Sequence, residues 1–192
     1  MFLLIALLLV LTGPATPALG ESIHREPGTV LRVVDGDTVD VQLGGRRERL
    51  RLIGLNTPET VDPRRPVECF GREASAKAKA LLPAGTRVYV EQDPQQGQRD
   101  RYGRLLAYLI LPDGRNFAEV MIADGYGFEY TYRLPYRYQE RFRAAQARAR
   151  AEQRGLWAPS ACPERRPDAP QARRADPQAQ GALRSAGRQP DS

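Results

Sequence analysis

Residues 49–59, RLRLIGLNTPE, combine arginine, an amide and a carboxylate in one short stretch. Leucine and arginine alternate over residues 49–52, which predicts a strand with one apolar face, and residues 54–58 are rich in turn formers. The planar guanidinium of Arg51 suits phosphate oxygens, whereas the carboxylate of Glu59 can bind a hard cation or take a proton from water. A turn leaves such groups facing solvent. The stretch therefore has the chemistry of a phosphodiester site.

Hydrolysis of a phosphodiester explains why these residue types would occur together. Attack of water gathers negative charge on the equatorial phosphate oxygens, and arginines and a divalent cation supply positive charge where it develops. A carboxylate can orient or deprotonate the attacking water. The single histidine, His24, precedes the first predicted strand. The sequence therefore excludes a nuclease that depends on paired histidines or on a histidine–metal cluster.

The acidic segment DGDTVD, residues 35–40, follows the first predicted strand as a tight turn. An EF-hand calcium loop has a similar start, but it needs glycine at its sixth position and glutamate at its twelfth. Those two positions hold Asp40 and Arg46 in this chain. We therefore exclude an EF-hand at this turn.

The composition favours one folded domain with an anionic partner. The chain has 192 residues, of which 41% are hydrophobic, and a formal net charge of +6, so nucleic acid is the commonest partner to expect. Lys77 and Lys79 are the only lysines among its 29 basic residues. An arginine-rich composition with no functional cause is the alternative explanation of the charge.

Both ends of the chain differ in composition from its middle. Residues 1–20 carry no charged side chain, and an apolar run over residues 2–11 is followed by small residues, with Ala18 and Gly20 in a cleavage pattern. This predicts a secretory signal peptide, a secreted or periplasmic protein, and no stable membrane association after cleavage. An uncleaved anchor is disfavoured because the run falls short of the ~20 residues that span a bilayer. Residues 163–192 contain almost no aliphatic side chains, which predicts a disordered polar tail.

The two cysteines, Cys69 and Cys162, both follow the predicted signal. In an oxidising compartment an even pair favours a structural disulfide over two free thiols. The bond would tie the segment after residues 49–59 to the end of the folded domain.

Hydrophobic periodicity predicts a mainly β domain with some helix, over residues 28–162. Period-two alternation and turn residues predict five strands, and spacings of three and four predict about three helices. Asn116 should cap the second helix, Pro135 lies near the start of the third, and Trp157 should pack against that helix. This order fits a five-stranded Greek-key barrel of the OB type, an α+β fold that binds nucleic acids or sugars. The predicted strands are 29–34, 39–43, one containing Arg51, 86–91 and 105–111, and the helices are 67–82, one after Asn116, and 135–154.

Five motifs occur in the order and spacing of the staphylococcal nuclease, or thermonuclease, family, which the chain resembles over roughly residues 28–158. The motifs are DGDT at 35–38, RLIGLNTPE at 51–59, FGREAS at 70–75, DRYGR at 100–104 and GLW at 155–157. The resemblance implies a calcium-dependent nuclease that cuts DNA and RNA, in single-stranded or locally unpaired form, and leaves 3′-phosphates. We expect it to act as a monomer.

The resemblance also implies a role for each matching residue. Arg51 and Arg104 match the two arginines on the scissile phosphate, and Glu59 matches the general base or water-positioning carboxylate. Three positions match metal ligands, Thr57 through its backbone carbonyl, and a fourth supports the metal site. The metal ligands are Asp37, Asn56 and Thr57, and the supporting residue is Asp35.

Two features of the resemblance leave questions open. Asn56 stands where the best-studied family member has a ligating aspartate, which predicts weaker calcium binding or more tolerance of other divalent ions, because affinity follows ligand charge. Tyr102, Tyr130 and Tyr132 match tyrosines that line the nucleotide pocket, although Tyr130 and Tyr132 could equally be packing residues.

Two other functions fit part of the sequence. A non-catalytic OB-fold module that binds nucleic acid would share the fold, but it would not require Arg51, Glu59 and Arg104 together. An extracellular adhesion or carbohydrate-binding domain would leave the arginines beside a carboxylate unexplained. The choice between DNA and RNA as biological substrate stays open.

Overall fold

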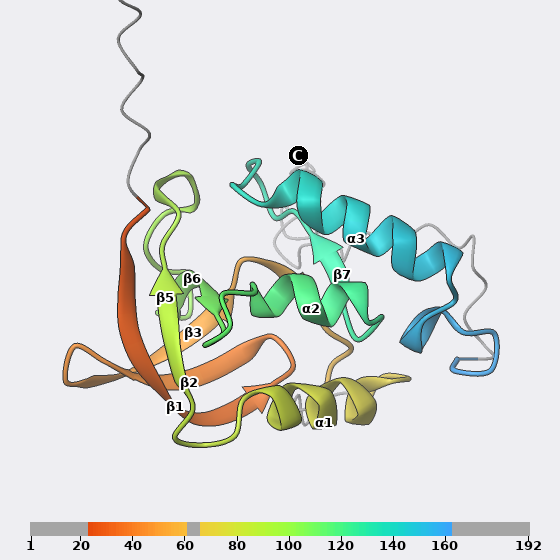
Figure 1. The fold of residues 1–192 in the computed structure, drawn as a ribbon, viewed down its shortest axis with the longest axis horizontal. Coiled ribbons are helices and arrows are strands. Elements are labelled where there is room, and N and C mark those ends of the chain that lie inside the picture. Colours follow the sequence, from red (N-terminus) through yellow and green to blue (C-terminus); the bar gives the residue numbers. More distant parts are fainter. Residues whose placement is uncertain (1–22, 61–65, 163–192) are drawn as a thin grey trace, which may run out of the picture.

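Five strands close into a barrel in the computed structural model, which describes residues 23–60 and 66–162 (Figure 1). Neighbours pair in the order β1-β2-β3-β6-β5, and β5 pairs with β1 to close the barrel. Every pair is antiparallel except β3 with β6. This mixed barrel confirms the predicted OB-type fold. The strands are β1 (Arg25–Asp35), β2 (Thr38–Leu43), β3 (Arg46–Leu52), β5 (Arg87–Glu91) and β6 (Leu105–Ile110).

The β2–β3 hairpin shows how the alternating sequence fixes the barrel. Gly44 and Gly45 both have positive φ, which is what a two-residue turn matching the twist of the strands requires. The turn sets the register, so that Asp40 faces Arg49 and Thr38 faces Arg51 across the pair. Valines and leucines at the intervening positions are buried in the barrel. Thr38, Asp40, Arg49 and Arg51 consequently share the outer face.

Three helices accompany the barrel: α1 (Gly71–Leu81), α2 (Phe117–Ala123) and α3 (Gln139–Ala151). Helix α2 lies between α1 and α3 and contacts both (Figure 1). As predicted, Asn116 caps α2, and its Oδ1 accepts a hydrogen bond of 2.9 Å from the backbone N of Ala118. Tyr108, Phe117 and Phe142 fill the core between barrel and helices. Short 3₁₀ turns occupy Pro94–Gln96 and Gly155–Trp157.

Helix α3 begins later than the position of Pro135 predicts. The Tyr138 hydroxyl donates to Glu91 at 2.7 Å, and the backbone N of Arg137 donates to Asp93 at 2.9 Å. These buried acceptors at the end of β5 hold residues 136–138 in a non-helical path, so that the helix starts at Gln139. Long-range hydrogen bonds therefore override the local signal.

Trp157 lies at the edge of the core. Its ring packs edge-on against Phe128 at 5.4 Å between centroids, and the guanidinium of Arg150 in α3 lies 4.2 Å from its centre. The residue fully buried in this turn is Leu156. The predicted contact with α3 is present, but the tryptophan is only half-buried.

A second, two-stranded sheet was missed by the sequence analysis. It pairs β4 (Gly54–Asn56) with β7 (Phe128–Tyr130), whereas residues 54–58 were predicted as a turn. Gly54 has φ of +77°, and a Cβ there would lie 2.7 Å from the rings of Tyr136 and Phe142. A glycine thus lets the chain leave β3 beneath these rings, which carries residues 54–56 to β7.

The structure contains the predicted disulfide between Cys69 and Cys162. The bond joins positions 93 residues apart, with 5.9 Å between their Cα atoms. In the chain-entropy model, a loop of this length stabilises the fold by about 4 to 5 kcal/mol. It anchors the segment that follows residues 49–59 to the end of the described domain.

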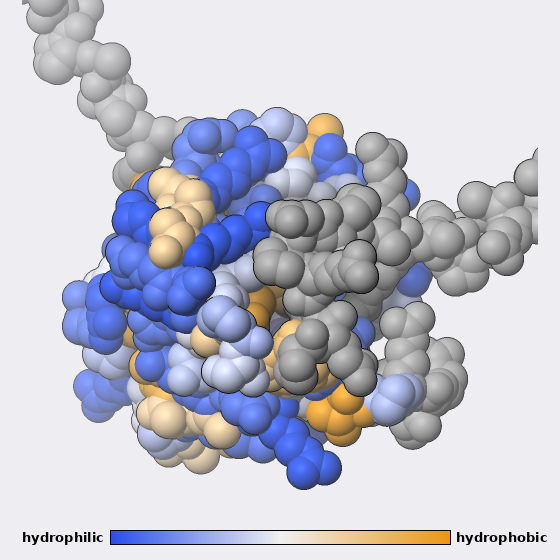
Figure 2. Space-filling view, turned by 90° about the vertical axis from the view of Figure 1, so that its right-hand side faces the viewer, coloured by the Kyte–Doolittle hydropathy of each residue, from blue (hydrophilic) through white to orange (hydrophobic). Residues whose placement is uncertain are grey.

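Hydrophilic residues cover most of the described surface in Figure 2, where apolar residues form small separate patches. None of the helices within residues 23–60 and 66–162 combines the length and apolar character that a membrane span requires. The predicted signal peptide, residues 1–20, and the predicted tail, residues 163–192, lie outside the described residues.

Candidate active site

The turn between β1 and β2 holds two buried carboxylates. Asp35 Oδ1 accepts hydrogen bonds from the Thr60 hydroxyl at 2.7 Å and from the backbone N of Gly36 at 2.8 Å. Asp37 Oδ2 accepts from the backbone N of Thr57 at 3.2 Å. A Cβ on Gly36 would lie 2.7 Å from the side chain of Thr57, so only glycine allows this close approach. The acidic turn therefore lies directly against Thr57, the residue that follows β4.

Arg51 is fixed between this turn and its own strand. Its Nη1 donates to the carbonyl oxygens of Leu52 at 2.9 Å and Leu55 at 2.6 Å. Its Nη2 lies 3.2 Å from Asp37 Oδ2 and 3.4 Å from Asn56 Oδ1. The side chain is only 15% exposed. Arg51 is therefore preorganised, with its charge beside two of the predicted metal ligands.

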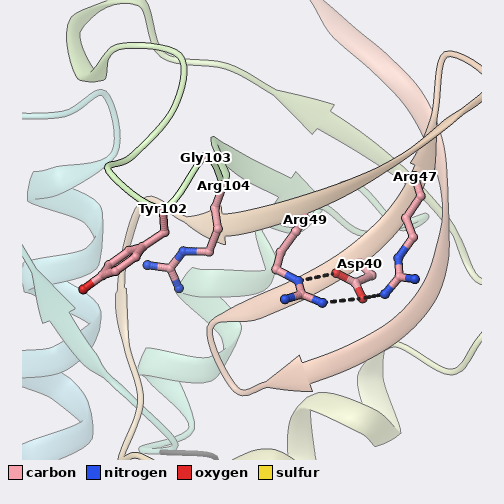
Figure 3. A pocket seen from close by; sticks show the side chains of 6 residues that line it. All are labelled: Asp40, Arg47, Arg49, Tyr102, Gly103 and Arg104. Carbon is pink, nitrogen blue, oxygen red and sulfur yellow. Dashed lines mark hydrogen bonds and ion pairs between the residues drawn. The ribbon is translucent and has the colours of Figure 1, made fainter.

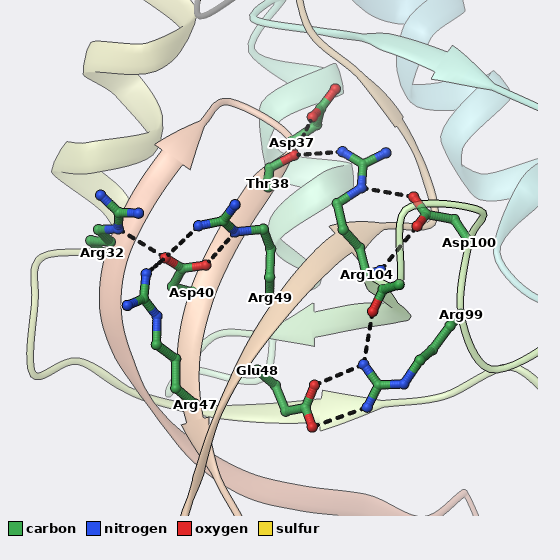
Figure 4. Close-up of polar contacts among 11 residues, drawn as sticks. Arg32, Asp37, Thr38, Asp40, Arg47, Glu48, Arg49, Arg99, Asp100 and Arg104 are labelled. Carbon is green, nitrogen blue, oxygen red and sulfur yellow. Dashed lines mark hydrogen bonds and ion pairs between the residues drawn. The ribbon is translucent and has the colours of Figure 1, made fainter.

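Arg104, the residue before β6, reaches Thr38 of the same acidic segment (Figure 4). The Nε and the backbone N of Arg104 donate hydrogen bonds to the carboxylate of Asp100, at 2.7 Å and 2.9 Å. The Nη1 of Arg104 donates to the Thr38 hydroxyl at 3.4 Å, and that hydroxyl donates to Asp37 Oδ1 at 3.0 Å. Arg51 and Arg104 are thus joined through Thr38 and Asp37, so the structure brings the two predicted phosphate-binding arginines together.

Glu59 lies in the loop after β4, half-buried. Its backbone N donates to Glu68 Oε2 at 3.1 Å, and its carbonyl accepts from the backbone N of Glu68 at 2.9 Å. Its own Oε1 accepts from the backbone N of Thr60, the residue whose hydroxyl binds Asp35. Because Cys69 is bonded to Cys162, the disulfide also steadies the neighbour that holds Glu59. The predicted base is therefore anchored beside the acidic turn.

The acidic turn has the electrostatics of a cation site. Burial is the largest cause that raises the pKa of Asp35, and the negative charges of Asp37 and Glu59 add to it. Hydrogen bonds from Thr60 and Gly36 act in the opposite direction, and the net effect raises the pKa to about 6. Gathered carboxylates repel one another, and a bound cation would relieve that repulsion.

The donor set fits a hard cation such as calcium. The hydroxyl of Thr57 is buried without a hydrogen-bond partner among the described residues, at the place where Asp37 approaches. Carboxylate, amide and carbonyl oxygens are the donors that calcium prefers. Within the described ranges, no three His, Cys, Asp or Glu residues form a metal-binding group, so a metal here would also need the oxygens of Asn56 and Thr57.

The three predicted substrate-binding tyrosines are all exposed. The exposed fractions are 67% for Tyr102, 42% for Tyr130 and 63% for Tyr132. Tyr102 lies 5.3 Å from the guanidinium of Arg104, and the rings of Tyr130 and Tyr132 lie 6.4 Å apart. This exposure disfavours the alternative that Tyr130 and Tyr132 are packing residues. Exposed aromatic rings can stack on nucleic-acid bases.

Sequence reasoning missed several residues that support the site. Thr60 and Glu68 position Asp35 and Glu59, but nothing in their local pattern reveals it. Asp40 accepts hydrogen bonds from three arginines across the β1–β2–β3 face, and pairing residues outward from the Gly44-Gly45 turn would have placed it opposite Arg49.

A small OB-type barrel with two fixed arginines and several carboxylates around one turn is the architecture of a protein that acts on phosphodiesters. Residues 49–159 match the family described as staphylococcal nuclease homologue. The chain belongs to this family.

Three relatives show what the chain is similar to. It is 40% identical over 147 residues to the thermonuclease of Staphylococcus hyicus, covering 76% of this chain and 84% of the relative. It is 37% identical over 135 residues to the thermonuclease of Staphylococcus intermedius, covering 70% and 78%. It is 33% identical over 133 residues to the endonuclease YncB of Bacillus subtilis, covering 69% and 62%. The chain is therefore a nuclease of the thermonuclease family, which confirms the predicted enzyme class.

Proposed function

We propose that the protein hydrolyses DNA and RNA in a calcium-dependent reaction that leaves 3′-phosphates, with Arg51, Arg104 and Glu59 as catalytic residues. The supporting observation is the chain of contacts from Arg51 through Asp37 and Thr38 to Arg104, which gathers both guanidiniums at one turn. The side chain of Glu59 is anchored beside the same turn through Thr60.

Each residue has a distinct task in this reaction. Arg51 and Arg104 bind the non-bridging oxygens of the scissile phosphate and stabilise the charge that grows there. Glu59 orients the attacking water and accepts its proton. The water oxygen bonds to phosphorus, the bond from phosphorus to the 5′ oxygen breaks, and that oxygen takes up a proton. Tyr102, Tyr130 and Tyr132 hold the adjoining nucleotides by stacking.

Calcium would be held by Asp37, Asn56 and the backbone carbonyl of Thr57, with Asp35 in support. When bound, it supplies positive charge to the phosphate oxygens and to the attacking water. Arg51 contacts both Asp37 and Asn56, so it keeps these side chains in place. The deep burial of Asp35 suits a supporting role.

We also propose that the protein works outside the cytoplasm as a monomer. Residues 1–20 would be removed as a signal peptide, and residues 163–192 would form a polar tail after the folded domain. The Cys69–Cys162 disulfide supports this location, because such bonds persist in oxidising compartments.

Removal of calcium should abolish cleavage. We expect the mature protein to degrade plasmid DNA, single-stranded DNA and RNA when calcium is present and to leave all three intact in excess chelator, with recovery when calcium is restored. A polymerase should extend the DNA products only after phosphatase treatment, because their 3′ ends carry phosphate. Retarded but intact nucleic acid in calcium would instead identify a non-catalytic binding module.

Changing Asn56 to aspartate should tighten calcium binding at least about fivefold. The substitution adds one formal negative charge to the ligand set, and even water-screened charges about 4 Å apart attract by about 1 kcal/mol. It also keeps an acceptor for Nη2 of Arg51. Calorimetric titration of calcium into both proteins measures the effect.

The matched control is Gln92→Glu, which adds the same charge in an exposed loop after β5 and should leave calcium affinity unchanged. Equal affinities of wild type and Asn56→Asp would show that residue 56 does not bind the ion.

A further inference from the structure

Three arginines surround one buried aspartate on the outer face of β1, β2 and β3. Asp40 Oδ2 accepts from Nε of Arg32 at 2.8 Å and from Nη2 of Arg47 at 2.5 Å, and its Oδ1 accepts from Nε of Arg49 at 2.7 Å (Figure 4). The Asp40 side chain is fully buried, whereas the arginine side chains are 44% to 59% exposed. We refer to these four residues as the Asp40 cluster.

The three guanidiniums of the Asp40 cluster carry more positive charge than the single carboxylate neutralises. Burial alone would raise the pKa of Asp40, but hydrogen bonds from Arg49, Arg32 and Arg47 outweigh it and hold the pKa well below its usual range. Asp40 is therefore ionised, and one negative charge faces three guanidiniums. The surplus positive charge lies on half-exposed side chains that Asp40 holds in a fixed arrangement.

The Asp40 cluster and the proposed active site share one hollow. A surface hollow of about 380 Å³ is lined by Asp40, Arg47 and Arg49 on one side and by Tyr102, Gly103 and Arg104 on the other. Figure 3 shows the side chains in a row that runs from Tyr102 through Arg104 and Arg49 to Arg47. A strand of nucleic acid whose scissile phosphate lies at Arg104 can therefore continue over the Asp40 cluster.

The guanidiniums retain donors for a ligand. Arg47 uses only Nη2 toward Asp40, and Arg49 uses Nε and Nη2. The structure gives Nη1 of neither arginine an acceptor within the described ranges. Arginine donors in a fixed plane match phosphate oxygens, and a groove of positive charge that follows the backbone is how OB folds hold single strands.

We propose that Arg47 and Arg49, held by Asp40, form a second phosphate-binding subsite for a nucleotide that flanks the scissile bond. Arg32 completes the Asp40 cluster from β1. The inference rests on the proposed function, since it places the scissile phosphate at Arg104. The subsite makes the enzyme prefer polynucleotides over dinucleotides, because a dinucleotide with one phosphodiester cannot occupy both places.

Substitution of Arg47 by glutamine tests the subsite, because Arg32 and Arg49 still hold Asp40 in this variant. For a single-stranded oligonucleotide of about 12 nucleotides, within the range that OB folds bind, we expect KM to rise about tenfold with kcat unchanged. The KM for a dinucleotide should not change. The plot of log affinity against log salt, measured by fluorescence anisotropy in chelator, should become shallower by about 0.7, the value for one lost phosphate contact on a single strand.

Arg115→Gln is the matched control. Arg115 is exposed to a similar degree, 60% against 56% for Arg47, and it pairs with a single aspartate, Asp113, outside the hollow. The Arg115→Gln substitution removes the same charge as Arg47→Gln. It should leave both KM values and the slope of the salt plot unchanged.

Other outcomes separate the subsite from the proposed function. The subsite is overturned if Arg47→Gln changes neither substrate, changes both equally, or matches Arg115→Gln. Wild-type protein that binds the oligonucleotide but cleaves neither substrate in calcium contradicts the proposed function, whereas the anisotropy comparison still decides on the subsite.

Discussion

Replacing Glu59 by glutamine should lower kcat by about 10² to 10⁴, the range typical of a lost general base. Glutamine has nearly the same shape, and its amide oxygen can still accept the hydrogen bond that Thr60 donates. What it loses is the ability to take a proton from water. Because the backbone contacts of Glu59 with Glu68 do not involve its side chain, the loop should keep its position. Single-turnover cleavage of a labelled oligonucleotide at saturating calcium measures the step.

A loss of this kind must be separated from a loss of structure. Oligonucleotide affinity and thermal unfolding of Glu59→Gln should match wild type within error, and calcium is kept saturating because the variant loses one negative charge beside the acidic turn. Glu68→Gln makes the same isosteric change in the residue that accepts a hydrogen bond from the backbone of Glu59. We expect it to cost less than tenfold, because glutamine retains an acceptor oxygen. Equal losses in the two variants would mean that both residues only position the loop.

The β2–β3 hairpin and the start of α2 could be predicted because their determinants are local. Alternating side chains in β2 and β3 and the Gly44-Gly45 turn set strand, face and register within a short stretch of chain. Asn116 likewise caps α2 through atoms two residues away. Such features depend on spacing that a single sequence displays.

The missed elements depend on partners that are distant in the sequence. Strand β4 has three residues, too few to show alternation, and it pairs with β7 more than seventy positions later. The start of α3 is set by Glu91 and Asp93, which no helix-start rule considers. Buried acceptors decided the conformation at the start of α3, and pairing with β7 decided it in β4.

The candidate site likewise has a part that the sequence predicts and a part that depends on contacts between distant residues. Its residue types and order resemble a family, so Arg51, Glu59 and Arg104 could be named before their geometry was known. The contacts that orient them could not be named, because they form only in the fold. Arg104 reaches Thr38, the Thr60 hydroxyl reaches Asp35, and Glu68 reaches the backbone of Glu59. Asp40 was considered only as an EF-hand position, yet its three arginine partners make it part of a basic surface.

Replacing Arg104 by lysine should lower kcat by about 10² to 10³, as removal of one preorganised donor to developing oxyanion charge typically does. The positive charge is kept, so the expected loss comes from geometry. Asp100 binds Nε of Arg104, which leaves the two terminal nitrogens for other acceptors. Within the described ranges, the only acceptor at Nη1 is the Thr38 hydroxyl. Lysine offers a single rotatable ammonium, which cannot bind Asp100 and grip a phosphate as a planar fork does. Steady-state kinetics on a single-stranded oligonucleotide give the comparison.

Arg99→Lys distinguishes catalysis from support of the loop. Arg99 lies in the same loop and grips Glu48 through Nη1 at 2.9 Å and Nη2 at 3.0 Å, so its planar fork holds the protein and not a substrate (Figure 4). The substitution should leave kcat within about twofold of wild type, because an exposed ion pair contributes at most about 1 kcal/mol to stability. If Arg104→Lys raised KM with kcat unchanged, Arg104 would bind the ground state and the transition state equally. Its charge would then hold the substrate without accelerating hydrolysis, and the catalytic role would pass to Arg51.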